Sequence, residues 1–102
     1  MESVAYLITP IYRKGNLNQD IREGEIKDMI YCTEESVSRS EFFEAGRSGF
    51  NPQTVITTPA INYSGQPECE YNGVRFSVYR TYYKKEADEI ELYLEIKAGV
   101  TH

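Results

Sequence analysis

The sequence predicts an all-β protein: a small antiparallel β-barrel of about six strands, with one long loop that carries a short helix. Three observations support this class. An Asn-Gly dipeptide stands between two runs of alternating apolar and polar residues, and the chain has nine tyrosines, which favour strands. The one helix expected is short and lies within residues 38–52. A chain with several strands and no long helix buries its apolar faces by closing a sheet. At 102 residues, the whole chain (1–102) is expected to form a single domain.

Residues 68–97 predict a three-stranded antiparallel meander. Asn72-Gly73 supplies the positive φ angles of a two-residue type I′ turn, and this turn fixes the register of the strands on either side. The residues expected to pair across it are Tyr71 with Val74, Glu70 with Arg75 and Cys69 with Phe76. Because side chains alternate between faces along a strand, one set should face the core: Cys69, Tyr71, Val74, Phe76, Val78, Ile90, Leu92, Leu94 and Ile96.

Three further strands are expected upstream, over residues 3–13, 26–37 and 53–61. The first has apolar residues on both faces, and Pro10 within it indicates an edge or a bulge because proline has no N–H to donate. A helix over residues 25–31 is an alternative to the second strand. The polar residues 14–25 predict a loop, and residues 64–67 predict a turn.

The loop 38–52 contains the expected helix. Ser38 or Ser40 can cap its start, and Gly46 can end it. Three of the four phenylalanines of the chain lie in this irregular segment, at positions 42, 43 and 50. Either some of them close an open end of the barrel, or at least one contacts another subunit.

Three tyrosines, Tyr79, Tyr83 and Tyr93, are expected on the mostly polar face of the meander. Single half-exposed tyrosine rings are ordinary on a protein surface. Several together, opposite a filled core face, favour a subunit interface.

Composition and charge exclude several classes. The formal net charge of −5 argues against a surface that grips nucleic acid, which needs clustered Lys and Arg. No apolar run approaches the roughly 20 residues of a membrane-spanning helix. The first residues lack the pattern of a signal peptide, so we expect a cytosol-like compartment and reduced thiols. Cys32 and Cys69 are therefore interpreted as core residues.

The sequence gives no positive argument for an enzyme. Its one histidine is His102, the last residue, and the two cysteines have no partners with metal-ligand spacing. The acidic residues over 88–95 alternate with core positions and are interpreted as an outer face, although sequence alone leaves a carboxylate pair for acid–base work open. We therefore expect no catalytic, cofactor-binding or metal-binding residues.

Two segments carry a resemblance to a known family. Residues 36–46, SVSRSEFFEAG, resemble the mid-chain signature of the head-tail joining (head closure, or stopper) proteins of tailed bacteriophages and prophages. Residues 70–79, EYNGVRFSVY, followed by 90–95, IELYLE, are similar to the C-terminal half of that family. The resemblance spans about residues 26–97. The first strand departs from it, because family members often open with a basic strand and this one is apolar until Arg13-Lys14.

The resemblance implies a non-catalytic connector. Such proteins form a ring beneath the portal and adaptor, seal packaged DNA in the head and provide the platform for the tail. The implied partners are further copies of the chain, the portal–adaptor complex and a tail or tail-completion protein. DNA crosses the channel without tight binding, and neither membrane nor cofactor takes part. The implied location is the head–tail connector of the virion, with the host cytoplasm before assembly.

By position, the loop 38–52 would face neighbouring subunits or the channel. Its candidate contact residues are Arg39, Glu41, Phe42, Phe43, Glu44, Arg47 and Phe50. Two other classes stay open at this point. One is a small β-barrel peptide-binding or adaptor module, favoured by the tyrosine-rich face. The other is a carboxylate-based hydrolase.

Overall fold

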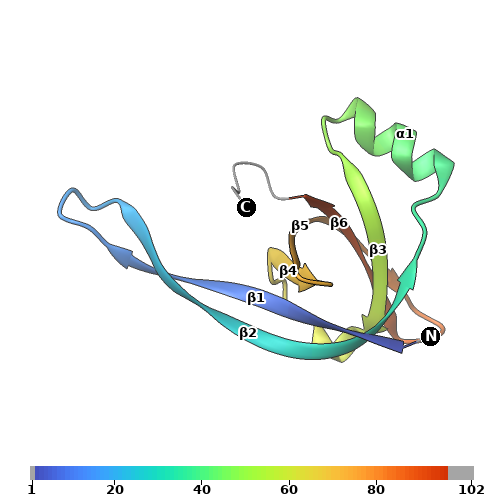
Figure 1. Ribbon diagram of the computed structural model, residues 1–102, viewed down its shortest axis with the longest axis horizontal. Coiled ribbons are helices and arrows are strands. Elements are labelled where there is room, and N and C mark those ends of the chain that lie inside the picture. Colours follow the sequence, from blue (N-terminus) through green and yellow to red (C-terminus); the bar gives the residue numbers. More distant parts are fainter. Residues whose placement is uncertain (1, 97–102) are drawn as a thin grey trace.

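The computed structural model of the protein describes residues 2–96, and its six strands form one antiparallel sheet that closes on itself (Figure 1). The order around the closed sheet is β1-β2-β3-β6-β5-β4, and β4 pairs again with β1. The elements are β1 (Glu2–Lys14), β2 (Asp20–Glu35), α1 (Arg39–Arg47), β3 (Pro52–Pro59), the 3-10 turn η1 (Ala60–Asn62), β4 (Glu68–Tyr71), β5 (Val74–Lys84) and β6 (Glu89–Ile96). The predicted class, an all-β barrel with one short helix in the 38–52 loop, is confirmed.

The meander forms in the predicted register. Tyr71 lies opposite Val74, and the two pairs that follow it are also those expected. Asn72 and Gly73 have φ angles of 53° and 76°, as the tight turn between β4 and β5 requires. Farther along, the β5–β6 pairing shifts between Val78 and Arg80, so that residue 79 is an extra residue in β5.

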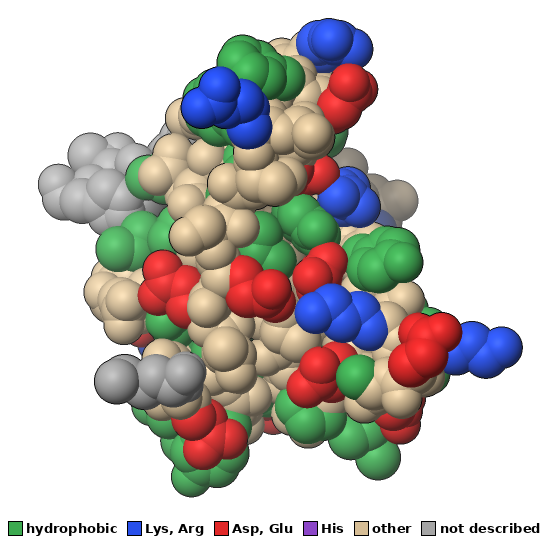
Figure 2. Space-filling model, turned by 90° about the vertical axis from the view of Figure 1, so that its right-hand side faces the viewer, with side chains coloured by type: hydrophobic (Ala, Val, Ile, Leu, Met, Phe, Trp, Pro, Cys, Tyr) green, Lys and Arg blue, Asp and Glu red, His purple; other side chains and the backbone are tan. Residues whose placement is uncertain are grey.

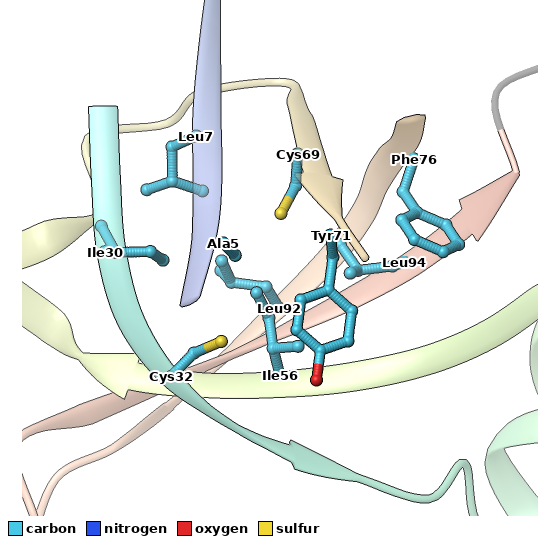
Figure 3. Close-up of a cluster of buried hydrophobic side chains, with 10 residues drawn as sticks. All are labelled: Ala5, Leu7, Ile30, Cys32, Ile56, Cys69, Tyr71, Phe76, Leu92 and Leu94. Atoms are coloured by element: carbon cyan, nitrogen blue, oxygen red, sulfur yellow. The ribbon is translucent and has the colours of Figure 1, made fainter. Parts of the chain in front are cut away.

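The core lies inside the closed sheet (Figure 3). Its buried side chains come from all six strands: Ala5, Leu7, Ile30, Cys32, Ile56, Cys69, Tyr71, Phe76, Leu92 and Leu94. Both cysteines are free and buried, as interpreted from the sequence. Ile96 was expected to face the core, but this was wrong: it is exposed where β6 ends, opposite Phe76. Strand alternation predicts which face of the sheet a side chain lies on. Burial also requires that other side chains cover it, and this depends on the rest of the fold.

The loop predicted over residues 14–25 is mostly strand. β1 continues to Lys14 and β2 begins at Asp20, so only residues 15–19 connect them. Residues 9–26, in which β1 and β2 pair only with each other, project from the barrel as a ribbon, which we call the arm (Figure 1). Ion pairs cross it, including Lys14 Nζ to Asp20 Oδ1 at 2.7 Å. The prediction failed because residues 14–25 are mostly polar and charged, so the sequence shows no apolar–polar alternation there.

Three local features of strands β1, β2 and β3 were also predicted from the sequence. Pro10 lies on a free edge, since β4 pairs with β1 only from Ala5 to Ile8, and the register shift of the arm follows one residue later. The alternative helix over residues 25–31 is wrong, because this segment is part of β2. The strand predicted over 53–61 ends at Pro59, where η1 takes over.

Candidate interaction site

Helix α1 begins and ends through local chemistry. The Ser38 hydroxyl accepts a hydrogen bond from the Glu41 N–H at 3.1 Å, so Ser38 rather than Ser40 is the cap. The predicted end at Gly46 is wrong, because the helix runs through Arg47 and its C-cap is Ser48. Gly49, with φ of 88°, takes the left-handed conformation that ends the helix.

Glu41 joins this helix to the barrel. Its carboxylate accepts hydrogen bonds from the Tyr79 hydroxyl at 2.7 Å and from Arg80 Nε at 3.3 Å, with a further bond from Arg80 Nη2. The Glu41 side chain is 11% exposed. The hydrogen bond from Arg80 holds the pKa of Glu41 below its ordinary value, and the bond from Tyr79 acts in the same direction. Burial, followed by the Glu41 carboxylate, raises the pKa of Tyr79.

The extra residue in β5 makes this arrangement possible. Neighbouring residues of a regular strand point to opposite faces, yet Tyr79 and Arg80 both reach the same carboxylate. Val78 lies opposite Leu94 and Arg80 lies opposite Tyr93, so the bulge is at residue 79. The Arg80 guanidinium then covers the Tyr93 ring at 4.0 Å from its centroid. The role of Arg80 was not found from the sequence, because nothing local in VYRTYY marks a bulge.

Aromatic contacts also join the helix segment to the barrel; with the Glu41 hydrogen bonds they form what we call the helix seat. The Phe50 ring stacks on Tyr79 at 4.9 Å between centroids, and Tyr79 meets Tyr93 edge-on at 6.2 Å. Burial raises the pKa of Tyr93 to about 12. A pocket of about 240 Å³ remains between helix and barrel, lined by Glu41, Glu44, Ala45, Ser48, Phe50, Tyr79 and Arg80.

The three tyrosines expected on one interface face are placed in two different settings. Tyr79 and Tyr93 are half-buried and meet each other. Tyr79 bonds to Glu41 of the helix, and the Tyr93 hydroxyl donates to Glu91 Oε1 at 2.8 Å. Tyr83 is exposed farther along β5, and its hydroxyl donates to Asp88 Oδ1 at 2.9 Å. The structure therefore brings together only two of the three, in a contact within the chain.

Phe42 and Phe43 point away from the barrel. They are 51% and 59% exposed, and their rings meet edge-on at 5.9 Å between centroids. An open groove of about 530 Å³ runs beside them, lined also by Val37, Ser38 and Arg39. Figure 2 shows hydrophobic side chains with Lys or Arg side chains beside them at the top of the molecule, where the helix lies. Phe42 and Phe43 do not close the barrel, whereas Phe50, although 39% exposed, stacks on Tyr79.

The other two predicted contact residues of the loop form a surface ion pair. Arg47 Nη1 lies 3.0 Å from Glu44 Oε1, three residues earlier on the helix, and both side chains are exposed. Such exposed pairs contribute little to stability. The exposed surface of the helix therefore carries the Phe42 and Phe43 rings and this ion pair.

A second exposed apolar surface lies on the outer face of β1 and β2. Val4 pairs with Tyr31 and Tyr6 pairs with Met29, so the four side chains form two adjacent cross-strand pairs. Their exposed fractions lie between 38% and 54%. The signal for this surface was in the sequence, because both strands carry apolar residues on two faces and only one face can line the core.

Ionic contacts fix the arm to the barrel. Arg75 of β5 contacts Glu25 of β2 at 2.8 Å and Glu68 of β4 at 3.1 Å. Arg22 of β2 contacts the same two carboxylates, each at 2.8 Å. The predicted partner of Arg75, Glu70, is farther away at 3.6 Å. The pKa of Glu25 is lowered, mainly by its hydrogen bonds from Arg75. Since these residues come from three strands, the network orients the arm.

The structure places most of the groups that the sequence offered for catalytic chemistry. Among residues 2–96, no group of three or more His, Cys, Asp or Glu is placed to hold a metal ion. Burial raises the pKa of the Cys32 thiol to about 11 and of the Cys69 thiol to about 12, so both are poor nucleophiles. His102 lies outside the described residues. Glu91 contacts Lys84 at 3.3 Å, and Glu95 accepts a hydrogen bond from the backbone N–H of residue 51.

Compared with known proteins, the chain matches no family model, no curated protein and no solved structure. Within the described part of the chain, no helix has the length and apolar character needed to cross a membrane. The fold and surfaces define a closed β-barrel with a filled core, a projecting arm and a helix that presents two phenylalanines to solvent.

Proposed function

We propose that this chain is a structural connector of a tailed phage. It would form a ring beneath the portal and adaptor, seal packaged DNA in the head and provide the surface to which the tail attaches. The resemblance of residues 36–46, 70–79 and 90–95 to head closure proteins supports the phage assignment.

One observation carries the proposal of an assembly role. Among residues 2–96, eleven of the fifteen exposed large hydrophobic side chains lie on β1, β2, their connection and the 38–52 segment. Apolar side chains exposed singly are ordinary on a protein surface, whereas contiguous apolar patches are typical of protein–protein contacts. The exposed apolar surface is therefore concentrated on the β1–β2 hairpin and on the 38–52 segment.

The charge of the chain is consistent with a channel that DNA must cross. Phosphate groups bind clustered Lys and Arg, and a net charge of −5 disfavours such binding. We expect the acidic side chains to line the lumen of the ring. A ring structure with a basic, DNA-contacting lumen would contradict this part of the proposal.

The function is tested with DNA-filled, tailless heads that carry the portal and adaptor, from the phage that encodes the chain. The purified protein should bind them and reduce DNA leakage. The double variant F42A/F43A should bind less well while keeping its thermal unfolding midpoint, because both rings are exposed. Y82A is the matched control, since Tyr82 is equally exposed on β5. A wild-type protein that binds neither heads nor tails would refute the connector role and favour a peptide-binding module.

A further inference from the structure

Two apolar patches lie on opposite sides of this chain. The helix patch consists of Phe42, Phe43 and the neighbouring Arg39. The sheet patch consists of the four outward side chains of β1 and β2, which are Val4, Tyr6, Met29 and Tyr31. In Figure 1, α1 lies at the top of the molecule and the β1–β2 ribbon runs along the bottom. One patch of a molecule therefore cannot cover the other patch of the same molecule.

The two patches differ in shape. The helix patch is a ridge, because the two phenylalanine rings stand edge-on to each other above an open groove of about 530 Å³. The sheet patch consists of two adjacent cross-strand pairs with a tyrosine in each. Aromatic rings favour edge-on and offset contacts with other rings. A tyrosine of the sheet patch can enter the groove beside the phenylalanines.

Charges at the margins match. Arg39 lines the groove of the helix patch and is exposed. Glu2 is exposed and lies opposite Thr33, next in the outward row after the Val4–Tyr31 pair. At the other end of this row, Lys27 is already paired with Glu70 at 2.9 Å. The end of the sheet patch next to Val4 is thus acidic and can receive Arg39.

We infer that the helix patch of one copy docks on the sheet patch of the next copy. The partner is therefore a second copy of this chain, bound head to tail through two different surfaces. Repetition of such a contact gives a ring when the rotation between copies closes and a filament when it does not. The inference rests on the proposed connector function and names the surfaces through which its subunits would meet.

The area of the patches sets the strength of the contact. An aromatic side chain buries about 150–250 Å² when fully covered, so half-exposed rings and their aliphatic neighbours offer on the order of a few hundred Å² per patch. Stable complexes bury about 1,200–2,000 Å² in total. A single contact should therefore be weak in solution, and it becomes persistent where a template holds several copies together.

Disulfide trapping tests the contact directly, because the two native thiols are buried and should not compete. The variants F43C and M29C are mixed at about 0.1–1 mM, where weak contacts are populated. L17C replaces M29C as the control, since Leu17 is highly exposed in the connection at the far end of the arm. The F43C–M29C dimer should form at least about tenfold faster than the F43C–L17C dimer. A chain that carries both F43C and M29C should give a ladder of oligomers.

Equal rates for the two mixtures, or a faster F43C–F43C homodimer, would overturn the docking of helix patch on sheet patch. Charge reversal provides a second measurement. R39E should slow trapping and E2R/R39E should restore it, and failure of the restoration would remove Glu2 as the partner of Arg39. Failure of the connector function is a separate result. A chain that binds heads without F43C–M29C trapping retains the function and refutes the inference, and the reverse result refutes the function alone.

Discussion

Replacement of Glu41 by glutamine should release helix α1 from the barrel. The carboxylate accepts three hydrogen bonds from Tyr79 and Arg80, and its side chain is 11% exposed. Glutamine keeps the size of the side chain, removes its charge and replaces one acceptor oxygen by a donor amide. The amide cannot accept from both partners as the carboxylate does.

The expected cost follows from these contacts. A hydrogen bond to a charged group contributes about 1.5–3 kcal/mol. Arg80 is substantially exposed, so water replaces part of the lost interaction and reduces the effect. We therefore expect E41Q to lower the free energy of unfolding by about 1–2 kcal/mol. In a domain of this size that corresponds to a fall of about 4–16 °C in the unfolding midpoint.

Two measurements show where the effect lies. Thermal unfolding followed by circular dichroism reports the loss of stability, and native-state hydrogen exchange should show faster exchange of the amides of residues 42–47. E44Q is the matched control, because Glu44 lies one turn along the same helix, is 68% exposed and forms a surface ion pair with Arg47. E44Q should change stability by less than about 0.5 kcal/mol. If E41Q and E44Q give the same midpoint and the same exchange rates, the helix seat as described is wrong.

The remaining predictions concern acid stability, thiol reactivity and the core. The hydrogen bond from Arg80 lowers the folded pKa of Glu41 below the ordinary 4.5, so the stability that Glu41 contributes is present above that pH and is lost as pH falls through the lowered value. Between about pH 5 and pH 2, the unfolding midpoint of E41Q should therefore fall less than that of the wild-type protein. The same acid dependence in both proteins would contradict this assignment. The pKa values of Cys32 and Cys69 are raised to about 11 and about 12. Both thiols should therefore resist maleimide at pH 7 in the folded protein and react with it in urea. Rapid labelling of the folded protein would show that the core is open. Leu92→Ala should cost about 2–5 kcal/mol in urea unfolding, whereas Leu17→Ala, at an exposed position, should change stability by less than about 0.5 kcal/mol; similar effects at both positions would place the core elsewhere.

Local chemistry in the sequence was enough for the meander and for the start of the helix. Asn72-Gly73 allows a two-residue turn, and once the turn is set, the period of two along a strand assigns each inward residue. Ser38 caps the helix because its hydroxyl meets an N–H only three residues away. These features depend on neighbours in sequence, so they can be predicted without knowledge of the rest of the chain.

The arm and the helix seat depended on contacts between distant segments. Residues 14–25 of the arm are mostly polar and charged, and the contacts of Arg22 and Arg75 with Glu25 and Glu68 join segments up to 50 residues apart. Likewise, Glu41 meets Arg80 only because a bulge turns two successive β5 side chains to one side.

The sequence by itself determined which residues pair in the meander, that Cys69 faces inward and that phenylalanines gather in the 38–52 loop. Only the tertiary structure decided that two of these phenylalanines face solvent while Phe50 packs on Tyr79. The physical reason is that turns and strand faces are set by short-range sterics and hydrogen bonds. The exposure of a side chain depends on which distant segment the closure of the sheet brings over it.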